Sequence, residues 1–145
     1  MKIALGSDHA GFELKEKIKQ HLQQQGVQVD DRGTNGTASV DYPDFAAAVG
    51  KAVVGGEDRL GVLVCGSGIG MSIAANKVQG VRAAHVGTEY DAQMAREHND
   101  ANVVAIGART MDEQKAFAIV DTFLKTDFAG GRHQTRVDKM MALEK

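Results

Sequence analysis

Short apolar runs alternate with longer segments of helical periodicity along the whole sequence. The clearest run is Leu60–Val64, which holds apolar and β-branched residues without a polar interruption. Such a run is typical of a parallel strand that helices cover on both faces. Strand-type and helix-type segments alternate five times. This pattern predicts a parallel sheet with right-handed crossovers and helices on both sides.

The fold class expected from this alternation is α/β, in the form of a three-layer Rossmann-like sandwich. We predict a five-stranded parallel sheet with helices on both faces and an extra C-terminal helix. The expected strands are Lys2–Gly6, Val27–Val29, Leu60–Val64, Val81–Val86 and Val103–Ile106. The expected helices run from Gly11 to a stop at Gly26, and over Tyr42–Gly55, Met71–Lys77, Glu89–Asn99, Met111–Leu124 and about Arg132–Leu143. Residues 1–145 contain no linker, repeat or charge block, which predicts a single domain.

Composition argues against several functional classes. Seventeen basic and nineteen acidic residues leave a net charge of -2, so the chain has no global basic field for nucleic acid. No apolar run approaches the roughly 18 residues of a membrane span. The single cysteine, Cys65, cannot form an intrachain disulfide and is a poor basis for a zinc site. We therefore expect no metal, no membrane partner and a reducing cytoplasmic location.

The most informative segment is Cys65–Gly70, which reads Cys-Gly-Ser-Gly-Ile-Gly directly after the strand expected over Leu60–Val64. In a sheet of this kind, ligands bind beyond the carboxyl ends of the strands. The glycines let the backbone approach a ligand, and backbone N–H groups that open a helix favour an anion and a thiolate at Cys65. The alternative interpretation is a buried and inert cysteine beside a turn.

Two other functions of glycine-rich loops do not fit this sequence. A cysteine phosphatase loop would need an arginine six positions after the cysteine, where the chain has Met71. A dinucleotide-binding fingerprint would need three glycines in the turn after the first strand, and Gly6–Gly11 lacks that spacing. Both functions are disfavoured.

Two polar pairs flank the expected strands. Asp8 and His9 follow the first strand. Asp8 can cap the next helix there, and this role is compatible with binding a ligand. His98 and Asn99 end the fourth helix, where a histidine can also serve only to complement the helix dipole. We expect both pairs on the same side of the sheet as Cys65, which favours one shared site.

The last helix begins with two arginines. Arg132 and Arg136 are four residues apart, so both guanidinium groups project from one helix face. Two such groups suit a phosphate or a carboxylate, although a solvated basic face is the simpler alternative. Arg109, after the fifth strand, would add a third positive group. His85 is a candidate residue for the lining of the ligand site, and no role is expected for His133.

Four segments carry a family resemblance when they are taken together. They are Gly6–Gly11, Cys65–Lys77, His98–Val103 and Gly130–Val137. In this order they resemble the type B ribose-5-phosphate isomerases of the ribose/galactose isomerase superfamily, over essentially the whole chain. The resemblance implies interconversion of ribose 5-phosphate and ribulose 5-phosphate, without a cofactor, by a homodimer or a dimer of dimers.

The resemblance also implies a role for each matching residue. Cys65 would be the base that moves a proton between C1 and C2, and His98 the acid that helps to open the furanose ring. Met71 stands where some relatives carry a glutamate base, which leaves Cys65 as the candidate. The glycine loop would hold the enediolate oxygens, and the arginines chiefly the phosphate. The substrate-binding residues would be Asp8, His9, Gly66, Ser67, Gly68, Ile69, Gly70, Asn99, Arg109, Arg132 and Arg136.

Alternatives to this function remain open at this point. The substrate could be a phosphohexose, such as allose 6-phosphate or galactose 6-phosphate. The chain could instead be a sugar-phosphate sensor, or a subunit without catalytic activity of its own. The last helix carries an apolar face that includes Val137 and Met140 and is a candidate subunit interface. We therefore predict that Arg132 and Arg136 reach the pocket of a neighbouring subunit.

Overall fold

Five strands and six helices make up the computed structural model, which describes residues 1–144. The strands are β1 (Lys2–Ser7), β2 (Gln28–Asp31), β3 (Leu60–Cys65), β4 (Ala83–His85) and β5 (Val103–Gly107). The helices are α1 (Phe12–Gln24), α2 (Tyr42–Val54), α3 (Ile69–Ala75), α4 (Glu89–Asn99), α5 (Glu113–Lys125) and α6 (Arg132–Met141). The predicted alternation and the extra C-terminal helix are confirmed.

All strand pairs of the sheet are parallel, in the order β2-β1-β3-β5-β4. The central strand β3 is buried along its whole length, as its uninterrupted apolar run predicts. From β1 the chain moves outward to β2 and then returns to the other side of β1 to form β3. The loops that follow β1 and β3 therefore diverge from neighbouring positions and leave a crevice between them.

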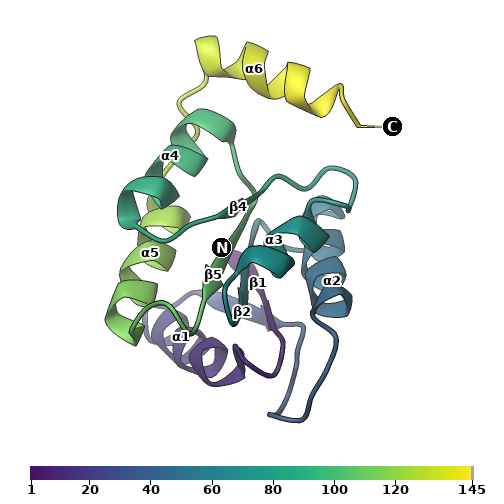
Figure 1. Ribbon diagram of the computed structural model, residues 1–145. Coiled ribbons are helices and arrows are strands. Elements are labelled where there is room, and N and C mark those ends of the chain that lie inside the picture. The colour runs from purple at the N-terminus through teal and green to yellow at the C-terminus, as the bar shows by residue number, and fades with distance from the viewer. Residues whose placement is uncertain (145) are drawn as a thin grey trace.

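Two apolar cores on opposite faces of the sheet create the three layers. One core joins the sheet to α1, α4 and α5, with Ile18 and Phe123 fully buried. The other joins the sheet to α2 and α3, with Val49 and Met71 fully buried. Figure 1 shows these two helix layers on either side of the strands, with α6 above α4 and outside the sandwich.

The structure shifts some of the expected boundaries, for local reasons. β4 has three residues instead of the six expected over Val81–Val86, because it is an edge strand that pairs with β5. α3 begins at Ile69 because Gly68 adopts a left-handed φ of 83° that completes the turn early. α5 begins after Asp112, whose side chain accepts a hydrogen bond of 2.9 Å from the Lys115 backbone N–H.

The C-terminal helix α6 is joined to the rest of the chain at both of its ends. Before it, the Ala129 N–H donates to the Glu97 carbonyl at 3.1 Å. After it, the Glu144 carboxylate accepts from the Gly80 N–H at 2.9 Å. Val137 packs inward, whereas Met140 is exposed. Among residues 1–144, no helix is both long and apolar enough to cross a membrane.

Candidate active site

A cavity of about 640 Å³ lies at the carboxyl ends of β1 and β3, where the topology predicts a ligand site. We call it the cysteine cavity. Its lining residues are Asp8, His9, Ala10, Tyr42, Cys65, Gly66, Ser67, Ile69, Gly70, Arg109 and Thr110. The Asp8 N–H donates to the Val64 carbonyl at 3.3 Å and ties the end of β1 to that of β3.

The Cys65 sulfur lies under a turn of the loop that follows β3. Cys65 is only 6% exposed, and the Gly68 N–H donates to its Sγ atom at 3.1 Å. The left-handed φ of Gly68 produces this approach, and an L side chain rarely adopts that conformation. A backbone donor aimed at the sulfur stabilises a negative charge there more than the neutral thiol.

Arg109 brings a positive charge to the same cavity. A Cβ atom placed on Gly66 would lie 2.8 Å from a guanidinium nitrogen of Arg109, so this side chain lies directly against the glycine loop. The Arg109 N–H also donates to the Gly66 carbonyl at 3.0 Å. Strand β5 and its following turn thus place a cation beside the thiol-bearing loop.

Asp8 and His9 also line this cavity, and the side chain of each accepts a hydrogen bond from the backbone. The Asp8 carboxylate accepts from the Gly11 N–H at 3.0 Å, so it holds the turn before α1, whereas the expected side-chain cap on the first turn of the helix is not formed. The Nδ1 atom of His9 accepts from the Val40 N–H at 3.1 Å. Because Nδ1 is an acceptor, the neutral ring carries its proton on Nε2, which is then available as a donor.

Tyr42 is a lining residue that the sequence reasoning missed. A Cβ atom on Gly70 would lie 2.7 Å from the Tyr42 ring, so the aromatic side chain packs on the glycine loop. Tyr42 begins α2, and helices that follow parallel strands begin at the carboxyl edge of the sheet. That position is the signal that could have identified it.

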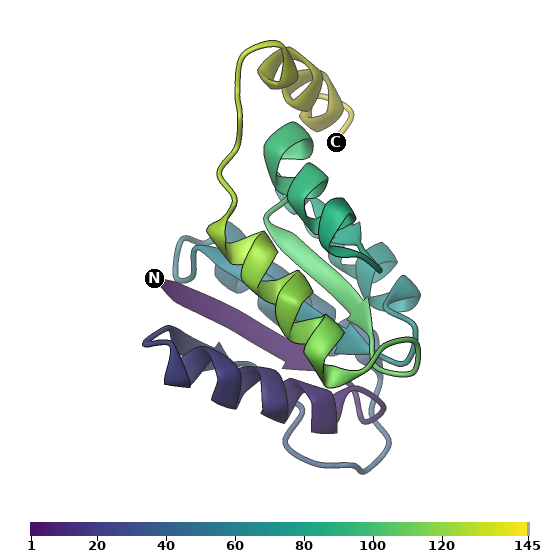
Figure 2. The ribbon, with the colours of Figure 1, turned by 90° about the vertical axis from the view of Figure 1, so that its left-hand side faces the viewer.

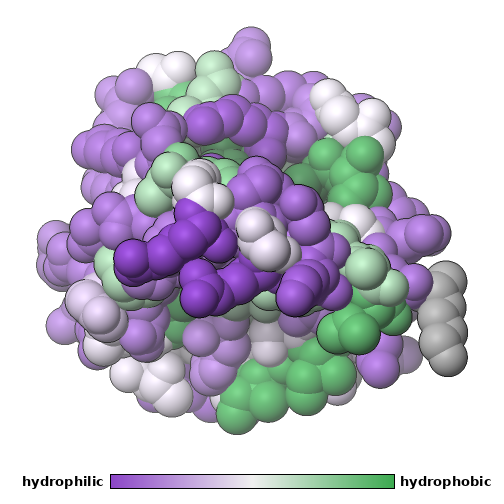
Figure 3. Space-filling model, turned by 90° about the horizontal axis from the view of Figure 1, so that it is seen from above, coloured by the Kyte–Doolittle hydropathy of each residue, from purple (hydrophilic) through white to green (hydrophobic). Residues whose placement is uncertain are grey.

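A second cavity, of about 550 Å³, lies between α4 and α6, and we call it the arginine cavity. It is lined by His98, Asn99, Arg132, His133 and Arg136. The predicted convergence of the two arginines on one face is confirmed. The rings of His98 and His133 stack with their centroids 4.3 Å apart. Seen from the α6 side, the surface is mostly hydrophilic with separate apolar patches (Figure 3).

Positive charge dominates the arginine cavity. Partial burial lowers the pKa of His133, and the positive charges of His98, Arg132 and Arg136 lower it further. Arg132 and Arg136 both line this cavity, and their guanidinium groups favour an anionic ligand there. The cavity is therefore suited to a phosphate group.

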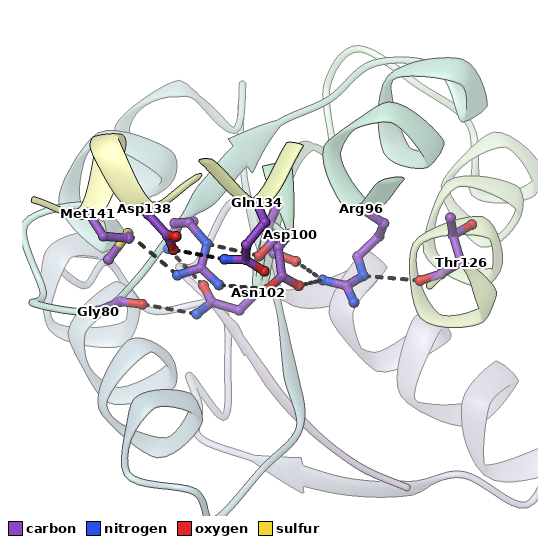
Figure 4. Close-up of polar contacts among 10 residues, drawn as sticks. Gly80, Arg96, Asp100, Asn102, Thr126, Gln134, Asp138 and Met141 are labelled. Atoms are coloured by element: carbon purple, nitrogen blue, oxygen red, sulfur yellow. Dashed lines mark hydrogen bonds and ion pairs between the residues drawn. The ribbon is translucent and has the colours of Figure 1, made fainter. Parts of the chain in front are cut away.

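The end of α4, which carries His98 and Asn99, is held by an aspartate between two arginines (Figure 4). Asp100 accepts from Arg96 at 3.0 Å and pairs with Arg82 at 3.4 Å. Arg96 is buried and also donates to the Thr126 carbonyl at 3.1 Å, while Arg82 donates to the Asp100 carbonyl at 2.9 Å. This network fixes the direction in which α4 ends.

The two cavities lie at opposite ends of the sheet, so one sequence-based expectation is wrong. His98 and Asn99 are not on the same side of the sheet as Cys65. A helix that connects parallel strands runs antiparallel to them, so its last residues return to the amino-terminal edge. Figure 2 shows the last turn of α4 beside α6, away from the strand tips. Arg109 is likewise separated from Arg132 and Arg136 within one chain.

Known proteins match both the sequence and the structure. The ribose/galactose isomerase family matches residues 3–140. Ribose-5-phosphate isomerase B of Escherichia coli K12 is 49% identical over 143 residues, which cover 99% of this chain and 96% of that protein. The structure of Clostridium thermocellum ribose-5-phosphate isomerase B has a TM-score of 0.97 and 52% identity, covering 99% of this chain and 97% of that one. Ribose-5-phosphate isomerase B from Mycoplasma genitalium, with bound ribulose 5-phosphate, has a TM-score of 0.93 and 45% identity, covering 97% and 94%.

These matches define the class of protein: it is an isomerase with a parallel α/β fold. The chain belongs to the ribose/galactose isomerase family. The resemblance carried by the four sequence segments is confirmed, and so is the predicted Rossmann-like fold class.

Proposed function

We propose that the chain interconverts D-ribose 5-phosphate and D-ribulose 5-phosphate through a cis-enediolate. The observation that carries this proposal is the Cys65 sulfur, which faces a sugar-sized cavity and accepts a hydrogen bond from the Gly68 N–H. Relatives that cover nearly the whole chain are ribose-5-phosphate isomerases, which supports the same substrate.

The proposed reaction needs one base and a set of donors. The Cys65 thiolate removes the proton from C2 of the open-chain aldose. The C–H electron pair forms the C1–C2 double bond, and the negative charge moves to O1. The proton on O2 passes to O1, the thiol returns its proton to C1, and the C2 carbonyl of the ketose forms. Backbone N–H groups of Gly66–Gly70 stabilise the enediolate oxygens, and no cofactor takes part.

The arginine cavity supplies the remaining functions in this proposal. Arg132 and Arg136 bind the phosphate, and that binding energy orients the reacting carbons. His98 protonates the ring oxygen to open the furanose, and Asn99 contacts a hydroxyl. In the cysteine cavity, Asp8, His9 and Arg109 contact the sugar and its phosphate end. The unpaired Cys65 fits a reducing compartment, and we propose the cytoplasm.

Because the two cavities lie far apart within one chain, we infer that each active site is formed by two subunits. Cys65 and His98 act on adjacent parts of one sugar, yet they lie at opposite ends of the sheet. A symmetric homodimer, alone or within a dimer of dimers, can place the arginine cavity of one subunit against the cysteine cavity of the other. The cysteine cavity is bordered by apolar residues of α3 that are open to a partner, since Ile69 is 53% exposed and Ile73 is 57% exposed.

The test is an isomerase assay with ribose 5-phosphate, allose 6-phosphate and galactose 6-phosphate side by side. We expect the highest kcat/KM with ribose 5-phosphate, whereas a preference for a phosphohexose would support that alternative substrate. The Cys65→Ala variant should lose turnover and retain sugar-phosphate binding. A sensor would bind the sugar phosphate in both forms of the protein and catalyse in neither.

A further inference from the structure

His85 contacts the glycine loop from a position outside the cysteine cavity. It is the last residue of β4, is exposed, and is not among the residues that line the cavity. Its Nε2 atom lies 2.8 Å from the Ser67 carbonyl oxygen. Because a carbonyl oxygen can only accept, Nε2 carries the proton and donates it to this bond.

The Ser67–Gly68 peptide group is thereby held at both of its ends. The Ser67 carbonyl is one end of this planar unit and accepts from His85. The Gly68 N–H is the other end and donates to the Cys65 Sγ at 3.1 Å. Hydrogen bonds that share one peptide group polarise each other, so the bond at the carbonyl strengthens the donor at the nitrogen.

Packing around this peptide group adds to the constraint. A Cβ atom on Gly68 would lie 2.8 Å from the His85 ring, and one on Gly107 would lie 2.6 Å from the Ser67 carbonyl oxygen. The peptide is therefore enclosed between the ends of β4 and β5. Glycine at position 68 would otherwise allow the peptide plane to rotate, because glycine tolerates both signs of φ. Such a rotation would turn a carbonyl oxygen toward the sulfur.

We propose that His85 is a positioning residue that keeps the Gly68 N–H directed at Cys65 and so stabilises the thiolate. This inference rests on the proposed function of Cys65 as the base. His85 does not contact the substrate in this proposal and acts only through the Ser67–Gly68 peptide.

The experiment compares His85→Leu with His85→Gln, whose amide can donate to the same carbonyl. His21→Gln serves as the control, because His21 pairs with Asp121 on the outer helices and does not line the cavity. Two quantities are measured for each protein: kcat/KM for ribose 5-phosphate, and the rate of Cys65 alkylation by iodoacetamide as a function of pH. The alkylation profile reports the thiolate without requiring catalysis.

For His85→Leu, we expect the alkylation midpoint to rise by about one pH unit, which corresponds to about 1.4 kcal/mol. At a pH below the midpoint of the unsubstituted protein, where kcat/KM is compared, the thiolate fraction and kcat/KM should therefore both fall by about tenfold. His85→Gln should restore both values to near those of the unsubstituted protein. The His21→Gln control should change neither.

Each other outcome is decisive. An unchanged alkylation midpoint in His85→Leu overturns the positioning role, whether or not kcat/KM falls. Failure of His85→Gln to restore the midpoint also overturns it, because the hydrogen bond would then not be the cause. A raised midpoint with unchanged kcat/KM supports the positioning role of His85 and contradicts Cys65 as the base, so the two proposals fail separately.

Discussion

The cysteine cavity and the arginine cavity differ in what holds their side chains in place. In the cysteine cavity, the Cys65 sulfur is buried at the end of a strand and accepts from a backbone N–H. In the arginine cavity, Arg132 and Arg136 are exposed long side chains on a helix outside the sandwich. The first arrangement is fixed by the fold, and the second can adapt to a ligand.

The difference indicates that the cysteine cavity carries out proton transfer and the arginine cavity binds the phosphate. Proton transfer needs its base and donors positioned to within fractions of an ångström, which a buried strand end and its loop provide. Binding of a phosphate tolerates mobile guanidinium groups, because each offers several donors in a fork. Substitutions in the cysteine cavity should therefore act mainly on kcat, and substitutions of Arg132 and Arg136 should act strongly on KM.

The largest effect is expected for Cys65→Ser. A serine hydroxyl at this place remains protonated near neutral pH, so kcat should fall by more than about 1,000-fold, or about 4 kcal/mol of barrier. Steady-state kinetics measure this loss, and equilibrium binding of ribose 5-phosphate should persist. Iodoacetate should inactivate the unsubstituted enzyme unless substrate protects it. Retention of more than about a tenth of the activity, only about 1.4 kcal/mol, would contradict the role of Cys65 as the base.

The next effect is expected for Arg136→Ala, which removes a charged donor from the proposed phosphate site. Loss of hydrogen bonds to a charged group costs about 1.5–3 kcal/mol, so kcat/KM should fall by up to about 100-fold with a raised KM. Lys139→Ala is the matched control, since Lys139 is an exposed cation on the same helix that does not line the cavity. Equal effects of the two substitutions would show that only the general charge of α6 matters.

A more selective effect is expected for His98→Asn. If His98 opens the furanose ring, conversion of ribose 5-phosphate should fall by about 10²-fold or more, as for loss of a general acid. Exchange of the C1 proton of ribulose 5-phosphate with deuterated water should be retained, because ribulose 5-phosphate does not form a furanose. Proton NMR measures this exchange. Parallel loss of both reactions would assign His98 to the enediolate step instead.

The stability of the fold should also depend on pH through Asp58, which lines neither cavity. Burial, together with the hydrogen bond and the charge of Asp30, raises the pKa of Asp58 to about 6. Neither carboxyl oxygen of Asp58 accepts a hydrogen bond from residues 1–144, so the protonated acid that donates to Asp30 is favoured. The contribution of Asp58 to stability is complete below its unfolded pKa and is lost as the pH rises through about 6.

We therefore expect the free energy of unfolding to fall by up to about 3 kcal/mol between pH 4 and pH 7 through this group. Asp58→Asn should remove most of that fall, because the amide does not ionise and can donate to Asp30. Asp127→Asn is the control, since the Asp127 side chain is 92% exposed. Denaturant titrations at several pH values measure the difference, and identical pH dependences in both variants would contradict the assignment.

Much of the fold could be predicted because its signals are local. The buried run Leu60–Val64 and the glycine stops define strands and loops within a few residues of their observed bounds. The chemistry of the loop Cys65–Gly70 is also local, since the strand end and the turn place the sulfur under its own backbone. Boundaries of edge elements such as β4 depend on the neighbouring strand and could not be read from the sequence.

The arrangement of the site could be predicted only in part, because it depends on the direction of the helices. His98 is close to strand β5 in sequence, but α4 runs back along the sheet and carries it to the opposite end. Tyr42 enters the cysteine cavity from α2, which no local motif indicates. The hydrogen bond between His85 at the end of β4 and the Ser67 carbonyl in the loop after β3 joins residues that are 18 positions apart in sequence, so no local pattern indicates it.

The central claim is that one active site is built from two subunits, and subunit complementation tests it most directly. Cys65→Ala and Arg136→Ala proteins are prepared separately, and each should be nearly inactive at substrate concentrations far below KM. After equimolar subunit exchange, verified by native mass spectrometry, half of the dimers are mixed, and each mixed dimer has one intact and one doubly altered site. The account predicts recovery of about a quarter of the unsubstituted activity. Persistent inactivity, despite verified exchange, would show that both residues serve the pocket of their own chain.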